Sequence, residues 1–101
     1  MILDFKEQSD IKVYNKKPWG YEKVLVDDRG FKVKIIVVDK GKRTSLQYHK
    51  EKREFFIFQD SSMRYISEGE QHRLTGPLEV IEFSFGEDSD IIRLQDDYGR
   101  S

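Results

Sequence analysis

The sequence predicts an all-β domain, and three observations support this prediction. The apolar residues are mostly β-branched or aromatic: nine Ile, seven Val, seven Phe and five Tyr stand against six Leu, two Met and no Ala. Such residues favour pleated strands, whereas Ala, Leu and Met favour helices. Short apolar runs are separated by breaks containing Gly, Pro, Asp or Ser, and no window shows a helical period. Many short strands at close spacing indicate a small barrel or sandwich.

The strands can be placed in order along the chain. Residues 31–34 alternate apolar and charged side chains, and residues 35–38 are apolar on both faces, which predicts a strand that enters a covered region. A strand at 21–26 precedes it across the turn 27–30, so the two should form a hairpin. Further strands are expected at 44–49, 54–58, 63–66, 71–74, 78–85 and 91–94.

Size and charge exclude several classes of protein. The 101 residues fit one domain, taken as 1–101, and the 18 basic and 19 acidic residues give a net charge of −1. No basic surface for nucleic acid or an anionic membrane is therefore expected, and no apolar run reaches the roughly 20 residues of a membrane span. Residues 1–10 do not have the pattern of a signal peptide, and the chain has no Cys. We expect a cytoplasmic protein without disulfides.

The two histidines of the chain, His49 and His72, are its candidate metal ligands. On a strand, Gln47, His49 and Glu51 share one face because side chains alternate with a period of two. Glu54 begins the next expected strand, so closure of the sheet would bring two histidines and one or two carboxylates together. Nitrogen and oxygen ligands of this kind suit Zn, Mn, Fe, Ni or Co, and the spacing does not choose among them. Alternatively, both histidines are solvated or partner-bonded strand residues and 51–54 is a charged loop.

Four segments carry a family resemblance. Residues 41–49 (GKRTSLQYH) followed by Glu54 resemble the first cupin motif, and 69–72 (GEQH) resemble the second. The opening 17–22 (KPWGYE) and the ending 96–100 (DDYGR) resemble the type II mannose-6-phosphate isomerase cupin. The resemblance covers about residues 15–100. It implies a single cupin domain, which is a small β-barrel or jelly roll.

The resemblance also implies an activity and a set of ligands. The activity is a metal-dependent interconversion of mannose 6-phosphate and fructose 6-phosphate, with a divalent ion held by His49, Glu54 and His72. Glu51 stands where the family has a further histidine, and it is expected as a fourth ligand in a more anionic site. Gln47 is either an alternative ligand or substrate contact, or a polar residue that lines the pocket. No residue can be assigned as the catalytic base.

Two arginines are candidates for the phosphate of the substrate. Arg43 lies just before the metal-binding strand and Arg100 belongs to the ending, and a guanidinium offers phosphate a bidentate contact. Surface ion pairs with some of the 19 acidic residues are the alternative for both. Trp19 either stacks on a sugar ring or belongs to the core.

The chain departs from the family pattern between residues 58 and 69. The segment is too short by about two strands and a turn, so either one hairpin of the barrel is missing or another subunit completes the barrel. Exposed strand edges usually need a cover, which predicts a homodimer. Two other functions stay open: a non-catalytic cupin that binds a sugar phosphate or nucleotide sugar, and a structural or oligomerisation cupin with a vestigial metal site.

Overall fold

The computed structural model describes residues 13–87 and 89–100, and over these residues it confirms an all-β chain. The described residues contain no helix that could span a membrane. The strands are β1 (Val13–Lys17), β2 (Gly20–Asp28), β3 (Phe31–Val38), β4 (Leu46–Tyr48), β5 (Arg53–Phe58), β6 (Met63–Ile66), β7 (Leu78–Phe85) and β8 (Ile92–Gln95).

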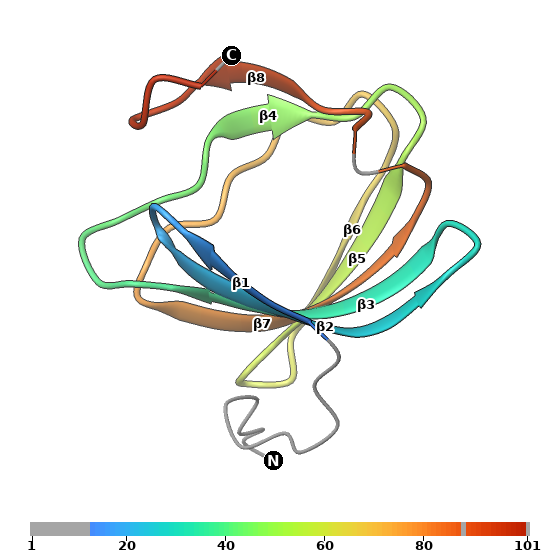
Figure 1. Cartoon of the computed structure of the whole chain (residues 1–101), viewed down its shortest axis with the longest axis horizontal. Coiled ribbons are helices and arrows are strands. Elements are labelled where there is room, and N and C mark those ends of the chain that lie inside the picture. The colour runs from blue at the N-terminus through green and yellow to red at the C-terminus, as the bar shows by residue number, and fades with distance from the viewer. Residues whose placement is uncertain (1–12, 88, 101) are drawn as a thin grey trace.

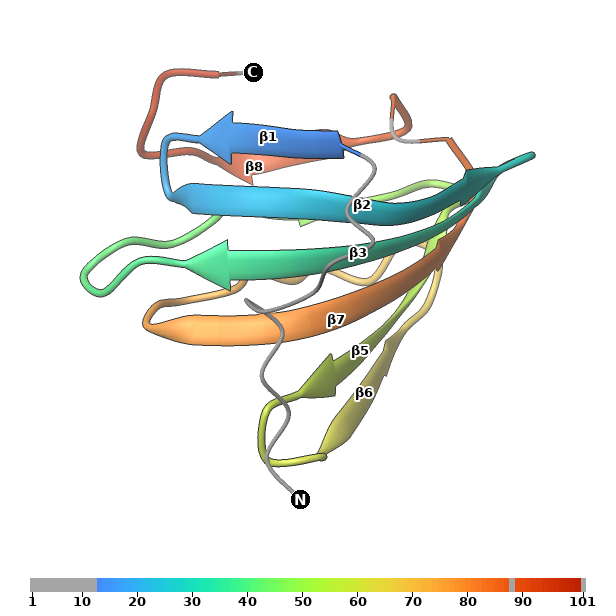
Figure 2. The same ribbon diagram turned by 60° about the horizontal axis from the view of Figure 1, so that its bottom comes forward.

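The strands form two antiparallel sheets that face each other. The larger sheet has the order β1-β2-β3-β7-β5-β6, which Figure 2 shows from one side. The smaller sheet contains only β4 and β8. In Figure 1 the large sheet curves along the bottom and right, and β4 and β8 lie across the top. We call the six-stranded sheet the floor and the β4–β8 pair the roof.

The hairpin of β2 and β3 confirms the turn expected at 27–30. Asp28 pairs with Phe31, so the loop consists of Arg29 and Gly30, which have φ angles of 54° and 86°. Two consecutive positive φ angles are typical of a type I′ turn, whose twist matches that of the flanking strands. The predicted strands 31–38 and 78–85 coincide with β3 and β7, which pair along their whole length.

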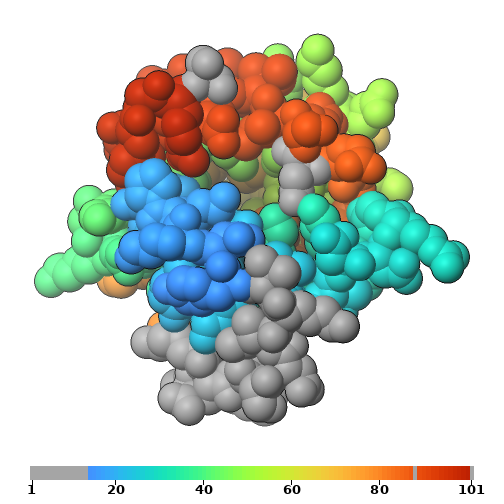
Figure 3. Space-filling view, viewed as in Figure 1, coloured from blue at the N-terminus to red at the C-terminus, as the bar shows by residue number. Residues whose placement is uncertain are grey.

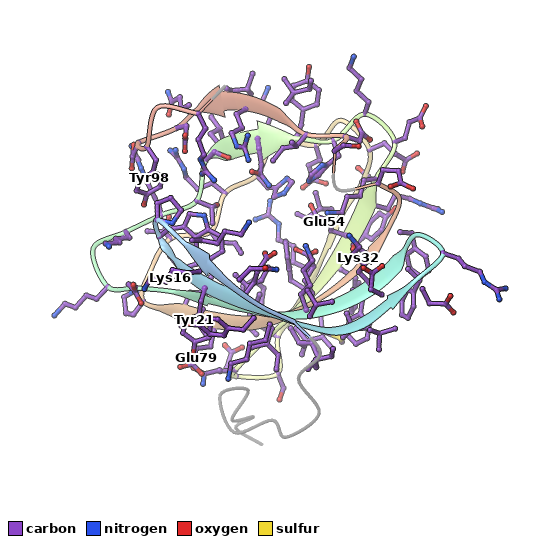
Figure 4. All side chains as sticks on the ribbon, viewed as in Figure 1. Lys16, Tyr21, Lys32, Glu54, Glu79 and Tyr98 are labelled. Atoms are coloured by element: carbon purple, nitrogen blue, oxygen red, sulfur yellow. The ribbon has the colours of Figure 1, made fainter. Side chains whose placement is uncertain are left out.

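The floor has an apolar cluster on each face, which explains why residues 35–38 are apolar throughout. Ile35 and Val37 pack with Tyr21, Leu25 and Ile81 on the outer face. Figure 4 shows Tyr21 and Glu79 on this outer side of the sheet. The inner face carries the main core, whose buried members are Trp19, Ile36, Val38, Phe56, Ile66, Leu74 and Val80.

Gly20 lets the chain pass close to β3 directly after Trp19. A Cβ atom at this position would lie 2.0 Å from the carbonyl oxygen of Val37, so only glycine fits. The close passage fixes the start of β2, and with it the preceding Trp19, whose residue surface is only 6% exposed. The Trp-Gly pair in the opening motif therefore has a packing role, and Trp19 belongs to the core.

Most predicted strands differ from the structure by two residues or fewer at an end, but one is halved in length, one is absent and one further strand is present. The strand expected at 44–49 is reduced to β4. Residues 71–74 do not form a strand: His72 makes a single bridge with Gln47, and the bridge of Arg43 with Thr75 lies just beyond the segment. These segments form a sparse layer opposite the floor, where few backbone groups pair. Strand β1 was not predicted, because its sequence VYNKK is largely polar; it forms through pairing with β2 at the sheet edge.

Candidate metal centre

His49, Glu54 and His72 converge between the floor and the roof. His49 follows β4, Glu54 belongs to β5, and His72 lies in the segment that bridges to Gln47. Glu54 Oε1 is 3.1 Å from His49 Nε2 and 2.9 Å from His72 Nε2, and each of the three side chains is only 3% exposed. Figure 4 shows Glu54 pointing to the interior. The predicted core of the ligand set is therefore brought together.

The outer nitrogens of both imidazoles meet backbone carbonyl groups. His49 Nδ1 contacts the Asp90 carbonyl oxygen, and His72 Nδ1 lies 3.1 Å from the Glu70 carbonyl oxygen. A carbonyl oxygen can only accept, so each Nδ1 carries a proton, and in the neutral form of the imidazole Nε2 presents a lone pair. Both lone pairs point at the Glu54 carboxylate, and none of these three buried atoms has a hydrogen-bond donor among the described residues.

Three acceptors that face one another repel unless a cation lies among them. All three ligand atoms lie within 4.8 Å of one another, which is the arrangement that a metal ion requires. The chemistry of the donors therefore fits a divalent metal held by two neutral imidazoles and one carboxylate.

Asp90 organises the turn between His49 and Glu54. Its carboxylate accepts hydrogen bonds from the backbone N–H groups of Lys50, Glu51 and Lys52, at 3.0, 2.7 and 3.0 Å. These hydrogen bonds, that of Glu51 most of all, lower the pKa of the Asp90 carboxyl although its partial desolvation opposes the shift. Sequence reasoning missed this role, because the contact joins residues about 40 positions apart.

The structure does not bring Glu51 to the cluster. Its side chain is exposed, and it lies in the turn that Asp90 holds. The expectation that residues 47, 49 and 51 share a face requires a continuous strand, but β4 ends at Tyr48. The chain turns immediately afterwards, so the alternation of side chains does not extend to residue 51.

Two further charged residues are buried beside the cluster, and sequence reasoning missed both. Lys52 Nζ lies 3.7 Å from Glu54 Oε2 and 3.9 Å from Glu82 Oε1. Burial and the nearby Glu54 charge raise the pKa of the Glu82 carboxyl well above its ordinary value. The signal for Glu82 was its place in β7, where Val80, Glu82 and Ser84 alternate onto the inner face.

A cavity of about 180 Å³ opens from the cluster between floor and roof. In the space-filling view the C-terminal segment, in red, borders a hollow above the N-terminal strands, in blue (Figure 3). Gln47 lines the cavity, and its Oε1 accepts a hydrogen bond from Ser45 Oγ at 2.6 Å. Besides the cluster, the polar lining consists of Lys17, Glu22, Lys34, Thr44, Ser45, Gln47, Lys52, Glu82, Arg93 and Arg100.

The two predicted phosphate ligands lie in different places. Arg100 lines the cavity and makes two side-chain hydrogen bonds to Asp96, at 3.0 and 2.9 Å. Arg43 is exposed and pairs with Asp97 at 2.8 and 3.0 Å, away from the cavity lining. The roof strand β8 contributes Arg93 instead, a cavity residue that sequence reasoning did not single out.

A two-histidine, one-glutamate cluster inside a small antiparallel β-structure defines a cupin-type domain with a candidate metal centre. The family model described as "Mannose-6-phosphate isomerase C-terminal" matches residues 4–96, and the chain belongs to this family. The match confirms the resemblance seen in the four sequence segments.

Curated relatives agree with the family. The chain is 35% identical to the alginate biosynthesis protein AlgA of Pseudomonas aeruginosa, with 93% of the chain and 24% of the relative aligned. It is 34% identical to the xanthan biosynthesis protein XanB of Xanthomonas campestris (89% and 24%) and 29% identical to a mannose-1-phosphate guanylyltransferase of Klebsiella pneumoniae (97% and 27%). The chain thus spans about a quarter of the length of these relatives.

The comparisons also bear on fold and length. The capsular polysaccharide assembling protein CapF of Staphylococcus aureus shares the fold at a TM-score of 0.51 and 16% identity, over 92% of this chain and 34% of that one. The alignment with AlgA runs over 118 positions. Because 93% of this chain is about 94 of its 101 residues, about 24 of those positions have no counterpart here. The chain is therefore shorter than this relative within the matched region.

Proposed function

We propose that this chain is a metal-dependent sugar-phosphate isomerase domain that interconverts mannose 6-phosphate and fructose 6-phosphate. The observation that carries the proposal is the meeting of three buried acceptors, His49, Glu54 and His72, at one end of a cavity that also holds cationic side chains. Family membership supports the same substrate class. A cavity of about 180 Å³ is small beside the roughly 300–1,000 Å³ usual for drug-sized ligands, which suits a sugar phosphate.

The reaction needs charge stabilisation and proton transfer. A base takes a proton from the carbon next to the carbonyl, negative charge develops on oxygen, and the proton is returned to the neighbouring carbon. A divalent ion held by His49, Glu54 and His72 would act as a Lewis acid toward that oxygen. The Lys52 ammonium lies beside the same cluster and adds a fixed positive charge in a site with little water. The Gln47 amide is placed to hold a sugar hydroxyl at the cavity wall.

The arginines of the roof side would bind the phosphate. Arg93 and Arg100 both line the cavity, and a guanidinium matches the geometry of phosphate oxygens. Arg43 would act indirectly in this proposal. It pairs with Asp97 and its carbonyl oxygen accepts the Tyr98 hydroxyl, so that it anchors the segment that carries Arg100. We further propose that the domain acts in the cytoplasm and as a homodimer.

The test is turnover of mannose 6-phosphate by purified protein loaded with Mn²⁺ or Zn²⁺, measured in a coupled assay together with bound metal. Glu54→Gln and His72→Ala should each lower kcat/KM by at least about a hundredfold and reduce the metal content. Glu79→Gln is the matched control, because Glu79 lies on the outer side of the floor. Turnover that survives both site substitutions would contradict the metal-dependent mechanism.

A binding-only cupin is the second candidate, and the shorter chain favours it. About 24 aligned positions of AlgA have no counterpart here, so this domain is smaller than the matching region of that relative. Metal and sugar-phosphate or nucleotide-sugar binding without turnover would identify this function. Protein that takes up no metal on dialysis would instead identify a structural or oligomerisation module with a vestigial site.

A further inference from the structure

The floor of the cavity carries a row of alternating acidic and basic side chains that crosses four strands. Glu22 on β2 lies 3.5 Å from Lys34 on β3, and Lys34 is opposite Glu82 on β7 in the strand register. Lys52, next to β5, then contacts both Glu82 and Glu54. The row thus runs from Glu22 to the metal cluster along the inner face of the sheet.

The far end of this row has no role in the metal centre. Glu22 and Lys34 are only 12% and 8% exposed, both line the cavity, and neither belongs to the cluster of metal-ligand candidates. Glu22 is also approached by Asn15 Nδ2 at 3.4 Å and by Lys17 Nζ at 3.9 Å. A buried ion pair seldom stabilises a fold more than well-packed apolar residues would, so its presence in a cavity wall points to ligand binding.

We propose that Glu22 and Lys34 form a subsite for the hydroxyl groups of a sugar phosphate. The inference rests on the proposed function, because it requires that the ligand enter this cavity. A carboxylate beside an ammonium suits a hydroxyl group, because the hydroxyl donates a hydrogen bond to the carboxylate and accepts one from the ammonium. Glu22 repels a phosphate, so the phosphate lies at Arg93 and Arg100 while the hydroxyls face the floor.

The distances along the sheet agree with this arrangement. Lys34 on β3 is two strands away from Glu54 on β5, in the order β3-β7-β5. Neighbouring strands lie about 4.8 Å apart, and Glu54 also lies two residues further along, opposite Ser84 rather than Glu82, so the backbone separation is roughly 12 Å. With its carbonyl end at the metal cluster and its phosphate at Arg93 and Arg100, a six-carbon sugar phosphate turns the hydroxyls between its two ends toward the floor, where Glu22 and Lys34 line the same cavity. Glu22 and Lys34 would therefore determine which sugars fit, since they meet hydroxyls remote from the reacting carbons.

The test compares two ligands in the variants Glu22→Gln and Lys34→Met. Calorimetric titration should show mannose 6-phosphate binding about ten- to a hundredfold more weakly, as expected for the loss of a hydrogen bond to a charged group. Inorganic phosphate, titrated into metal-free protein, should bind as in the wild type, and Mn²⁺ affinity should also stay unchanged. Lys34→Arg should restore part of the loss. Lys23→Met is the matched control, because Lys23 lies against Tyr21 on the outer face.

The outcomes separate this inference from the proposed function. Equal weakening of both ligands, or unchanged binding of mannose 6-phosphate, would overturn the subsite. Wild-type protein that binds mannose 6-phosphate without converting it would contradict the isomerase activity. The affinities of the two variants for mannose 6-phosphate would still test the subsite. Wild-type protein that does not bind mannose 6-phosphate would overturn both.

Discussion

Asp90 shows how one side chain can prepare a metal centre without entering it. Its carboxylate accepts hydrogen bonds from the backbone N–H groups of the turn after His49, and its carbonyl oxygen contacts His49 Nδ1. The same residue thus fixes both the position of the ligand and the nitrogen that faces the metal. Such outer partners orient ligands that would otherwise move between rotamers.

Replacing Asp90 should therefore weaken metal binding. In Asp90→Asn an amide N–H₂ group replaces one acceptor oxygen. Because it is itself a donor, it cannot pair with the backbone N–H groups of the turn, so the turn shifts and His49 loses its orientation. We expect Mn²⁺ or Zn²⁺ affinity to fall by about ten- to a hundredfold, as measured by competition with a chelating dye.

The matched control for this experiment is Asp60→Asn. Asp60 also accepts hydrogen bonds from a nearby turn, from the N–H and hydroxyl of Ser62, but it lies in the β5–β6 hairpin. This variant should bind metal like the wild type. Equal affinities in Asp90→Asn and the wild type would show that Asp90 does not position His49.

At the residue scale, the sequence predicted the site residues that belong to a recognisable motif and missed those whose role depends on contacts between distant parts of the chain. His49, Glu54 and His72 were expected as ligands, and they meet. Glu51 was expected with them because strand alternation was assumed to continue, whereas the chain turns after Tyr48. Asp90 could not have been recognised, because its role arises only when the roof closes over the turn.

At the scale of elements, one arginine–aspartate pair fixes the conformation of the C-terminal segment and a second pair attaches the segment to the rest of the domain. Arg100 binds Asp96 within the segment. Arg43, which precedes the roof strand β4, binds Asp97. The pKa of Asp96 is lowered to about 2, mainly by the hydrogen bond from the Arg100 side chain, although desolvation of the carboxyl opposes this shift. The Asp96 side chain is only 2% exposed. The segment therefore depends on an ionised carboxylate.

This dependence predicts a pH effect on stability. The pKa of an unfolded Asp is about 3.9, so the contribution of Asp96 is complete above that pH and is lost as the pH falls toward 2. In urea unfolding, Asp96→Asn should be less stable than the wild type at pH 6, and the difference should shrink as the pH falls from 5 to 2. Arg100→Gln should reproduce this trend. A difference that stays constant over the range would show that the pair does not titrate as described.

The elements that were predicted well are those whose pairing is regular. β3 and β7 carry long runs of β-branched and aromatic residues and pair with each other over eight residues each, so local pattern and tertiary pairing agree. The segment 71–74 makes a single bridge, that of His72 with Gln47. Its four residues are too few for their sequence pattern to distinguish a strand from an extended connection.

At the scale of the whole molecule, β6 leaves one edge of the floor open. Among the described residues β6 pairs only with β5, and it carries the exposed side chains of Met63 and Tyr65. The shortfall of about 24 positions against AlgA agrees with a hairpin missing from the barrel. The sequence pattern predicts that shortening between residues 58 and 69, beside this open edge.

A second copy of the chain should cover this edge. We expect light scattering after gel filtration to give about twice the 12.0 kDa chain mass, and Met63→Lys with Tyr65→Lys to give the single-chain mass. Leu94→Lys replaces another exposed apolar residue, on the roof strand β8, and should leave the dimer intact. A monomeric wild-type protein would contradict the prediction.

Trp19 gives the molecule a built-in optical signal. It is the single tryptophan of the sequence, it belongs to the buried core, and it also lines the cavity. One fluorophore therefore reports two events. Unfolding exposes the indole to water and shifts its emission to longer wavelength, whereas a ligand that displaces water from the cavity shifts it the other way. Folding and ligand entry can thus be followed in the same unlabelled sample.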